Sequence, residues 1–170
     1  MDMKHAVLSI VLIAIFVAFQ MGYAAPLGPA TWFVGAIVFS VILMLMGKTA
    51  MAKSTPNIKS VWMLATIFVI AITFIISFLG PYVGAVFPPG FDPASLTPLV
   101  LSMWLIVFGG AMFVTGMEMK MAPATLIGII WIFSAMHLVT VTAAGPNSYL
   151  HFAFVTGLPM LIASFVVNKK

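Results

Sequence analysis

The two side chains that could most readily do chemistry together in this 170-residue chain are histidines. His137 lies near the end of one long apolar run and His151 near the beginning of the next, with the short segment AAGPNS between the runs. Such a connection makes consecutive helices antiparallel neighbours, so we expect both imidazoles at one end of a helix pair. Imidazole can bind a metal ion, haem iron or a proton. Without a nearby carboxylate or cysteine, however, two histidines are an incomplete metal site. Separate packing roles are the alternative, and we expect no metal or cofactor.

Two further polar side chains would suit the mouth of a pathway for a small solute. Glu118 ends an apolar run beside Lys120, where it could gate a pathway or accept a proton. An interfacial ion pair with Lys120 is the alternative. Gln20, near the end of the first apolar run, could contact a solute or bond to a neighbouring helix.

Small residues, hydroxyls and one proline complete the candidates for a pathway lining. A proline inside a helix frees a backbone carbonyl, and glycines either leave a narrow passage or let helices approach closely. Pathway lining and close helix packing therefore remain alternatives. The residues concerned are Ser102, Gly109, Gly110, Thr115, Thr156 and Pro159.

The composition indicates an integral membrane protein. Hydrophobic residues make up 64% of the chain and charged residues 6%, against about 25% charged in ordinary soluble domains. The mean hydropathy is +1.25. No basic patch is interleaved with aromatic residues, so we expect no nucleic-acid partner. The sequence contains no cysteine, and we find no enzyme motif in it, which favours a protein without catalytic activity.

Six apolar runs are long enough to cross a bilayer, since a transmembrane helix needs about 20 mostly apolar residues. We therefore predict an all-α fold, with residues 1–170 forming a single six-span transmembrane domain. The first run could instead be a signal peptide cleaved after Ala24, but its length and the early Asp2 argue against this. The runs are 5–25, 29–47, 60–80, 97–117, 122–142 and 149–167.

The lysines support this count and predict the orientation. Six spans put all seven lysines on one side of the membrane and only Asp92 on the other. By the positive-inside rule both termini are then cytoplasmic. The lysines are Lys4, Lys48, Lys53, Lys59, Lys120, Lys169 and Lys170.

The two halves of the chain share a sequence pattern. PATWFVGAIVFS at 29–40 matches PATLIGIIWIFS at 123–134 in five of twelve positions, and VLSIVLI at 7–13 matches VLSMWLI at 100–106 in five of seven. We interpret these matches as a three-span repeat with halves of about 1–80 and 95–170. Because each copy has three spans, the second copy enters the membrane from the side opposite to the first, as in many transporters. Pro29 and Pro123 should therefore begin their helices at opposite faces of the membrane.

Two functions fit these observations. The first is a channel or facilitator for a small neutral or weakly charged solute, since buried carboxylates for a strongly ion-coupled pump are missing. The alternative is a non-catalytic integral subunit of a larger membrane complex, of an oxidase or respiratory type. The expected partners are the lipid bilayer and either a small solute or other membrane subunits, in a homo-oligomer or a hetero-complex.

Overall fold

The computed structural model describes residues 3–28, 30–52, 54–79, 96–141 and 147–166, and these residues form helices and turns without a strand. Six helices in this part of the chain are long and apolar enough to cross a membrane. The predicted all-α fold with six spans is confirmed. The helices are α1 (Met3–Gln20), α2 (Ala30–Ala52), α3 (Pro56–Phe74), α5 (Thr97–Glu118), α6 (Ala122–Val141) and α7 (Ser148–Val166).

A local signal explains where α3 begins. The hydroxyl of Thr55 accepts a hydrogen bond from the amide of Ile58 at 3.4 Å, and Pro56 occupies the first turn of α3. This cap starts α3 four residues before the apolar run that predicted it. A π-helical turn, η2 (Ile75–Leu79), continues α3 at its other end. A short 3-10 turn, η1 (Ala25–Leu27), lies between α1 and α2.

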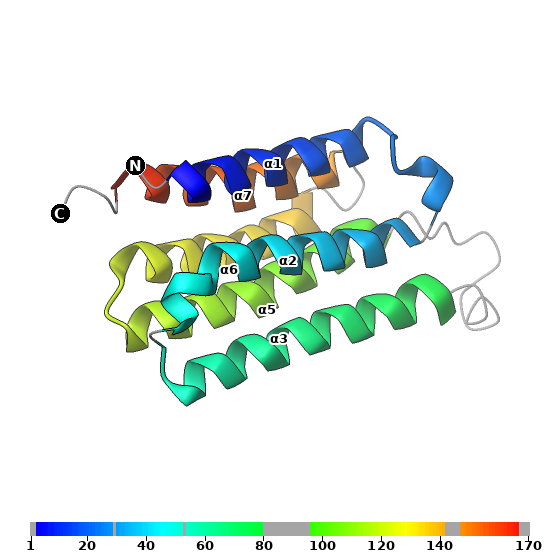
Figure 1. Ribbon diagram of the computed structural model, residues 1–170. Helices are drawn as coiled ribbons and strands as arrows, with labels where there is room; N and C mark the ends of the chain where they lie inside the picture. The colour runs from blue at the N-terminus through cyan, green and yellow to red at the C-terminus, as the bar shows by residue number, and fades with distance from the viewer. Residues whose placement is uncertain (1–2, 29, 53, 80–95, 142–146, 167–170) are drawn as a thin grey trace.

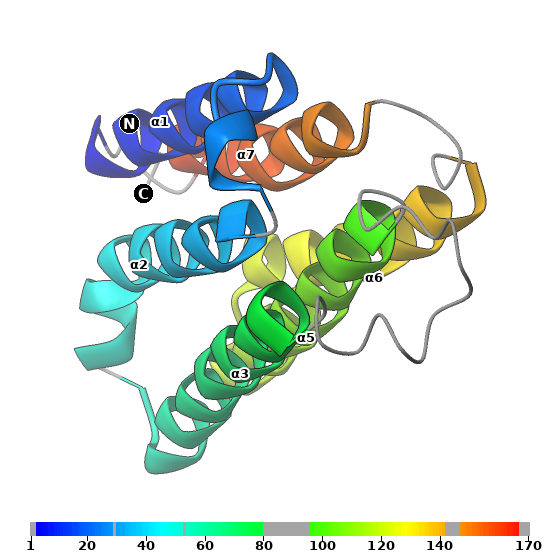
Figure 2. The ribbon, with the colours of Figure 1, turned by 90° about the vertical axis from the view of Figure 1, so that its right-hand side faces the viewer.

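The helices alternate in direction and form two packed groups. α1 and α7 lie side by side on one side of the bundle, whereas α3, α5 and α6 form a row (Figure 1). Seen from the end, α2 lies beside α3, between the row and the α1–α7 pair (Figure 2). The most extensive helix contact is that of α5 with α6, followed by that of α1 with α7.

The two halves of the chain do not have the same neighbours. α5 packs closely against α6, whereas α1 packs mainly against α7 and has little contact with α2. α2 and α6 begin at opposite ends of the bundle (Figure 1), but six alternating spans require this with or without a repeat. Pro29 lies outside the described residues. The inverted repeat therefore stays a prediction.

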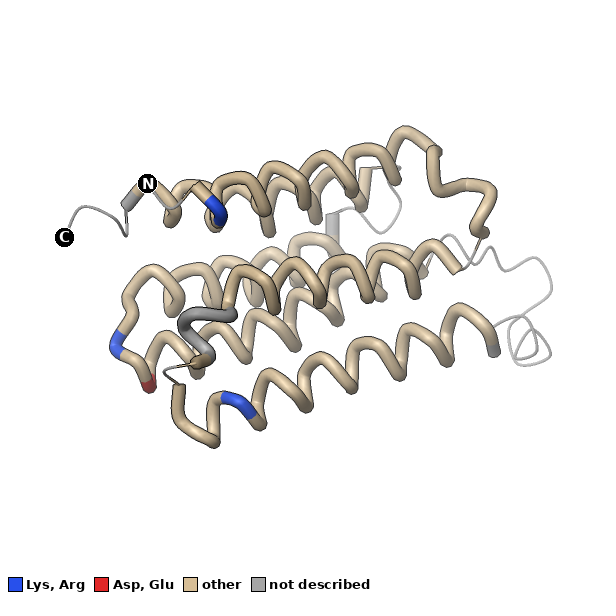
Figure 3. Tube along the Cα trace, in the orientation of Figure 1, with Lys and Arg blue, Asp and Glu red and all other residues tan. Residues whose placement is uncertain are grey.

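All charged residues whose side chains the structure describes lie near one end of the bundle (Figure 3). Lys4 and Lys59 stand in the first turns of α1 and α3, while Glu118 and Lys120 stand where α5 connects to α6. We call this the lysine end. The side chains of the remaining lysines and of both aspartates lie outside the described residues. Within the described part, the membrane-spanning middle carries no charge.

Aromatic rings fill the centre of the bundle. The ring centroid of Phe39 on α2 lies 5.0 Å from that of Phe152 on α7, 5.3 Å from Phe108 and 5.9 Å from Trp131. Phe16 on α1 lies 4.8 Å from Phe152. All five side chains are fully buried. Rings from α1, α2, α5, α6 and α7 therefore meet at one level, and such edge-to-face and tilted contacts add to the packing energy.

Candidate functional site

Gln20 binds the beginning of α7. Its side-chain carbonyl accepts hydrogen bonds from the amides of Tyr149 at 3.2 Å and Leu150 at 3.3 Å. The first amides of a helix have no partner within that helix, so the side chain of α1 acts here as a cap supplied by another helix. Of the two alternatives for Gln20, the structure shows a bond to a neighbouring helix.

The hydroxyl candidates also bond within the protein. Ser102 on α5 donates to the carbonyl of Ala135 on α6 at 3.1 Å. Thr115 donates to the carbonyl of Ala111 at 2.8 Å, and Thr156, which is fully buried, donates to the carbonyl of Phe152 at 2.7 Å. These bonds satisfy the hydroxyls inside an apolar bundle, where an unpaired polar group is costly.

The two central glycines of α5 have different surroundings. A Cβ at Gly109 would lie 3.1 Å from the carbonyl oxygen of Gly128 on α6, so this glycine belongs to a close helix contact. A Cβ at Gly110 would meet no atom within 4 Å. Pro159 lies half-buried inside α7, which continues as a helix on both sides of it.

Glu118 contacts α3 rather than Lys120. Its carboxylate accepts a hydrogen bond of 2.5 Å from the hydroxyl of Thr55, the residue that caps α3. The structure has no ion pair between Glu118 and Lys120. The structure therefore does not form the ion pair that was one of the two alternatives for Glu118, because the carboxylate bonds to the cap of α3 instead.

His137 and His151 come together as the short connection predicts. Their ring centroids are 5.0 Å apart, and their planes are inclined by 19°, a stacked arrangement. His137 is exposed on α6, and His151 is half-buried on α7, with its Nε2 atom buried and without a hydrogen-bond partner. The pair lies near the end of the bundle opposite the lysine end, since α6 ends and α7 begins there (Figure 1).

The stacked arrangement does not form a metal site by itself. An imidazole nitrogen binds a metal in the plane of its ring, and two stacked rings with nearly parallel planes and centroids 5.0 Å apart do not direct their nitrogens at one metal position. Among the described residues, no group of three histidine, cysteine or acidic side chains could hold a metal ion. The pair offers hydrogen bonds instead, because the Nε2 atom of His151 can donate or accept one.

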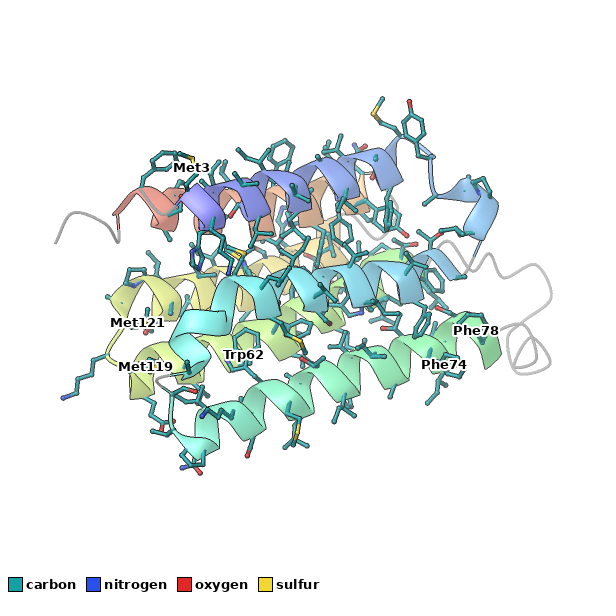
Figure 4. All side chains as sticks on the ribbon, viewed as in Figure 1. Met3, Trp62, Phe74, Phe78, Met119 and Met121 are labelled. Carbon is teal, nitrogen blue, oxygen red and sulfur yellow. The ribbon has the colours of Figure 1, made fainter. Side chains whose placement is uncertain are left out.

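Sequence reasoning missed the role of the tryptophans. Each of the four donates its indole N–H to an acceptor on a helix other than its own, and three of the acceptors are threonine hydroxyls. Figure 4 shows Trp62 directed from α3 into the bundle. A buried indole usually finds an acceptor, so tryptophans within apolar runs, with threonines in other runs, were the available signal. The bonds are Trp32 to Thr97 at 3.2 Å, Trp62 to Thr115 at 2.8 Å, Trp104 to Thr73 at 2.9 Å and Trp131 to the carbonyl of Val155 at 3.1 Å.

The structure does not bring the candidates for a pathway lining to one place. Gln20 lies at the end of the histidine pair, and Glu118 at the lysine end. Ser102 lies between α5 and α6, and Thr115 between α5 and α3. Comparisons with models of protein families, with curated proteins and with solved structures find no match to this chain.

Proposed function

We propose that this protein is a non-catalytic integral subunit of a larger membrane complex. The observation that carries the proposal is the aromatic centre of the bundle. Phe39 has ring contacts with five other buried rings, two on α5 and one each on α1, α6 and α7. Protein interiors packed in this way hold their helices in one arrangement and leave few voids larger than a water molecule.

The hydrogen bonds of the candidate residues support the same function. A transport pathway needs polar groups that can exchange partners with a passing solute. Here Gln20, Ser102 and Thr115 each bond to a second helix. Bonds of this kind fix the relative positions of helices, which is what a scaffold subunit requires.

His137 indicates where a second subunit would pack. Its imidazole is exposed on α6 and makes a ring contact with His151. Polar side chains on transmembrane helices commonly bond to a neighbouring helix. A helix of another subunit over this end of α6 would offer such a bond and would also cover the exposed side chains of Phe133 and Met136.

A channel or facilitator is the second candidate, and the sequence match between the two halves favours it. Inverted repeats recur in transporters. Because rings occupy the centre of the bundle, we would place such a pathway between copies of the chain and not through one copy.

The state of the protein in its own membrane distinguishes the two functions. We would extract the tagged full-length chain in a mild detergent and in a membrane-solubilising copolymer, and determine the composition and stoichiometry of what co-purifies. For a subunit, we expect the same unrelated membrane proteins at a fixed ratio in both preparations. A homogeneous oligomer of this chain alone would contradict the subunit.

Solute uptake tests the channel directly. The purified chain would be reconstituted into liposomes, with empty liposomes as the control, and the uptake of urea, ammonia, short carboxylates and water would be measured. For a subunit, we expect the same rates with and without protein. A protein-dependent rate for any of these solutes would favour the channel.

A further inference from the structure

A hollow of about 450 Å³ lies on the outside of the α5–α6 pair at the lysine end. It combines a cationic side chain with aliphatic ones, and it is open to the surroundings of the bundle. Met119 and Met121 flank Lys120 in the connection between the helices at this end (Figure 4). The lining residues are Gly116 of α5, Lys120 of the connection, and Ala122, Thr125, Leu126 and Ile129 of α6.

The lining follows one face of α6 from the membrane boundary inward. The α6 residues recur every three to four positions, so they share one side of the helix. The eight residues from Ala122 to Ile129 span about 10 Å along the helix, since seven steps of 1.5 Å separate the first from the last. Lys120 stands at the outer end of this face, and the exposed side chains of Leu126 and Ile129 stand at the inner end. The hollow therefore changes from cationic to apolar over about two helical turns.

The contact of α5 with α6 forms the floor of the hollow. A Cβ at Gly116 would collide with the backbone and the hydroxyl of Thr125. The two helix backbones therefore touch at this point, and a molecule in the hollow lies over the contact, not between the helices.

Lys120 has no carboxylate partner in the described structure. The nearest acidic residue along the chain, Glu118, bonds to the hydroxyl of Thr55, which caps α3. α3 and α6 lie on opposite sides of α5 in the row (Figure 2). The negative charge is thus held on the α3 side of α5, whereas Lys120 is one of the residues that line the hollow on the α6 side.

We propose that this hollow binds one anionic phospholipid, with its phosphate at Lys120 and an acyl chain along Leu126 and Ile129. A lysine ammonium is a compact positive charge suited to a phosphate. Near a membrane surface, each lysine contributes about 1 kcal/mol to the attraction of anionic lipid. The order of cationic and apolar groups in the hollow matches that of a phospholipid at this depth. The site is independent of whether the protein is a subunit or a channel.

Native mass spectrometry of the purified full-length chain tests the proposal. Protein in mild detergent would be titrated with phosphatidylglycerol or with phosphatidylcholine of the same acyl chains, and bound lipids counted. We expect the first phosphatidylglycerol to bind more tightly than phosphatidylcholine. Lys120→Gln should weaken the binding of this first phosphatidylglycerol about fivefold, and Lys120→Arg should retain its affinity. Ile129→Trp, which fills the apolar end, should also weaken it.

Lys59→Gln is the matched control, because Lys59 is exposed at the same end of the bundle but on α3. We expect this variant to bind phosphatidylglycerol as the unchanged protein does. Circular dichroism of each variant checks that the fold is retained. Three results would each overturn the proposal. They are an equal affinity of the unchanged protein for the two lipids, an equal loss of phosphatidylglycerol affinity in Lys59→Gln and Lys120→Gln, and an unchanged phosphatidylglycerol affinity in Ile129→Trp.

Discussion

The indole nitrogen of Trp104 on α5 lies 2.9 Å from the hydroxyl oxygen of Thr73 on α3, and both side chains are fully buried. A second bond joins the same two helices in the opposite sense, since Trp62 on α3 donates to Thr115 on α5 at 2.8 Å. Because the helices are antiparallel, the two bonds lie toward opposite ends of the α3–α5 contact. Together they fix both the spacing and the register of the two helices.

Replacing the acceptor of the first bond should destabilise the bundle. Thr73→Val keeps the shape of the side chain but leaves the indole N–H of Trp104 buried without a partner, at a cost of about 1 kcal/mol. Thr73→Ser retains a hydroxyl and should cost less. The free energy of unfolding in mixed detergent and dodecyl sulfate micelles, followed by tryptophan emission, measures the difference. Equal stabilities of the two variants would show that this bond contributes little.

The glycines of α5 and α6 provide a matched pair of substitutions. A Cβ at Gly128 would lie 2.6 Å from the carbonyl oxygen of Gly109 and 2.6 Å from the amide of Phe113. Because these are backbone atoms, they cannot move aside without separating the helices, so Gly128→Ala should cost about 1–3 kcal/mol. Gly110→Ala meets no atom within 4 Å and should be neutral or slightly stabilising. The thermal unfolding midpoint of each variant measures its stability. If Gly110→Ala lowered the midpoint as much as Gly128→Ala did, the expected close contact at Gly128 would be contradicted.

The cap that Gln20 provides should control the opening of α7. Gln20→Leu removes the acceptor for the amides of Tyr149 and Leu150, and we expect these amides to exchange with solvent about five- to tenfold faster, as for the loss of about 1 kcal/mol at a helix cap. Gln20→Glu retains an acceptor oxygen and places a negative charge at a helix N-terminus, which is favourable. Hydrogen exchange of peptides from residues 147–152 measures both variants. Unchanged exchange in Gln20→Leu would mean that other acceptors protect these amides.

The absence of cysteine from the sequence allows single cysteines to report the orientation. The positive-inside rule predicts that the lysine end faces the cytoplasm. A membrane-impermeant maleimide should then label Asn147→Cys in intact cells and label Lys120→Cys only after the cells are permeabilised. Equal labelling of both variants in permeabilised cells is the control. The reverse pattern would invert the topology.

The spans could be predicted from the sequence because each is an apolar run between polar or proline-rich segments. The proximity of His137 and His151 followed from the short connection and was also predictable. The side of each helix that faces the protein interior could not be predicted from the sequence. In a soluble helix, the apolar side marks the core, but in a membrane the lipid is as apolar as the core. Phe39 is fully buried and Phe133 is exposed, yet nothing in their sequence surroundings separates them.

The sequence does not indicate what each polar candidate bonds to. Gln20 and Thr115 were singled out from the sequence as polar groups in apolar runs that could line a pathway. A free polar group and a bonded one look the same in a sequence, however, because the partner lies on another helix. For Thr115 that partner is Trp62, 53 positions away, and for Gln20 it is the amide of Tyr149, 129 positions away.

The pairing of α1 with α7 has a consequence for the synthesis of the chain. The 127 residues between Gln20 and Ser148 take about 6 to 25 s to synthesise at roughly 5–20 residues per second. During that time, α1 cannot pack against α7, where a Cβ at Gly157 would collide with the side chain of Ile13. Insertion machinery or lipid must cover this face of α1 until α7 emerges. Of the six helices, α1 is therefore among the last to reach its packing partner.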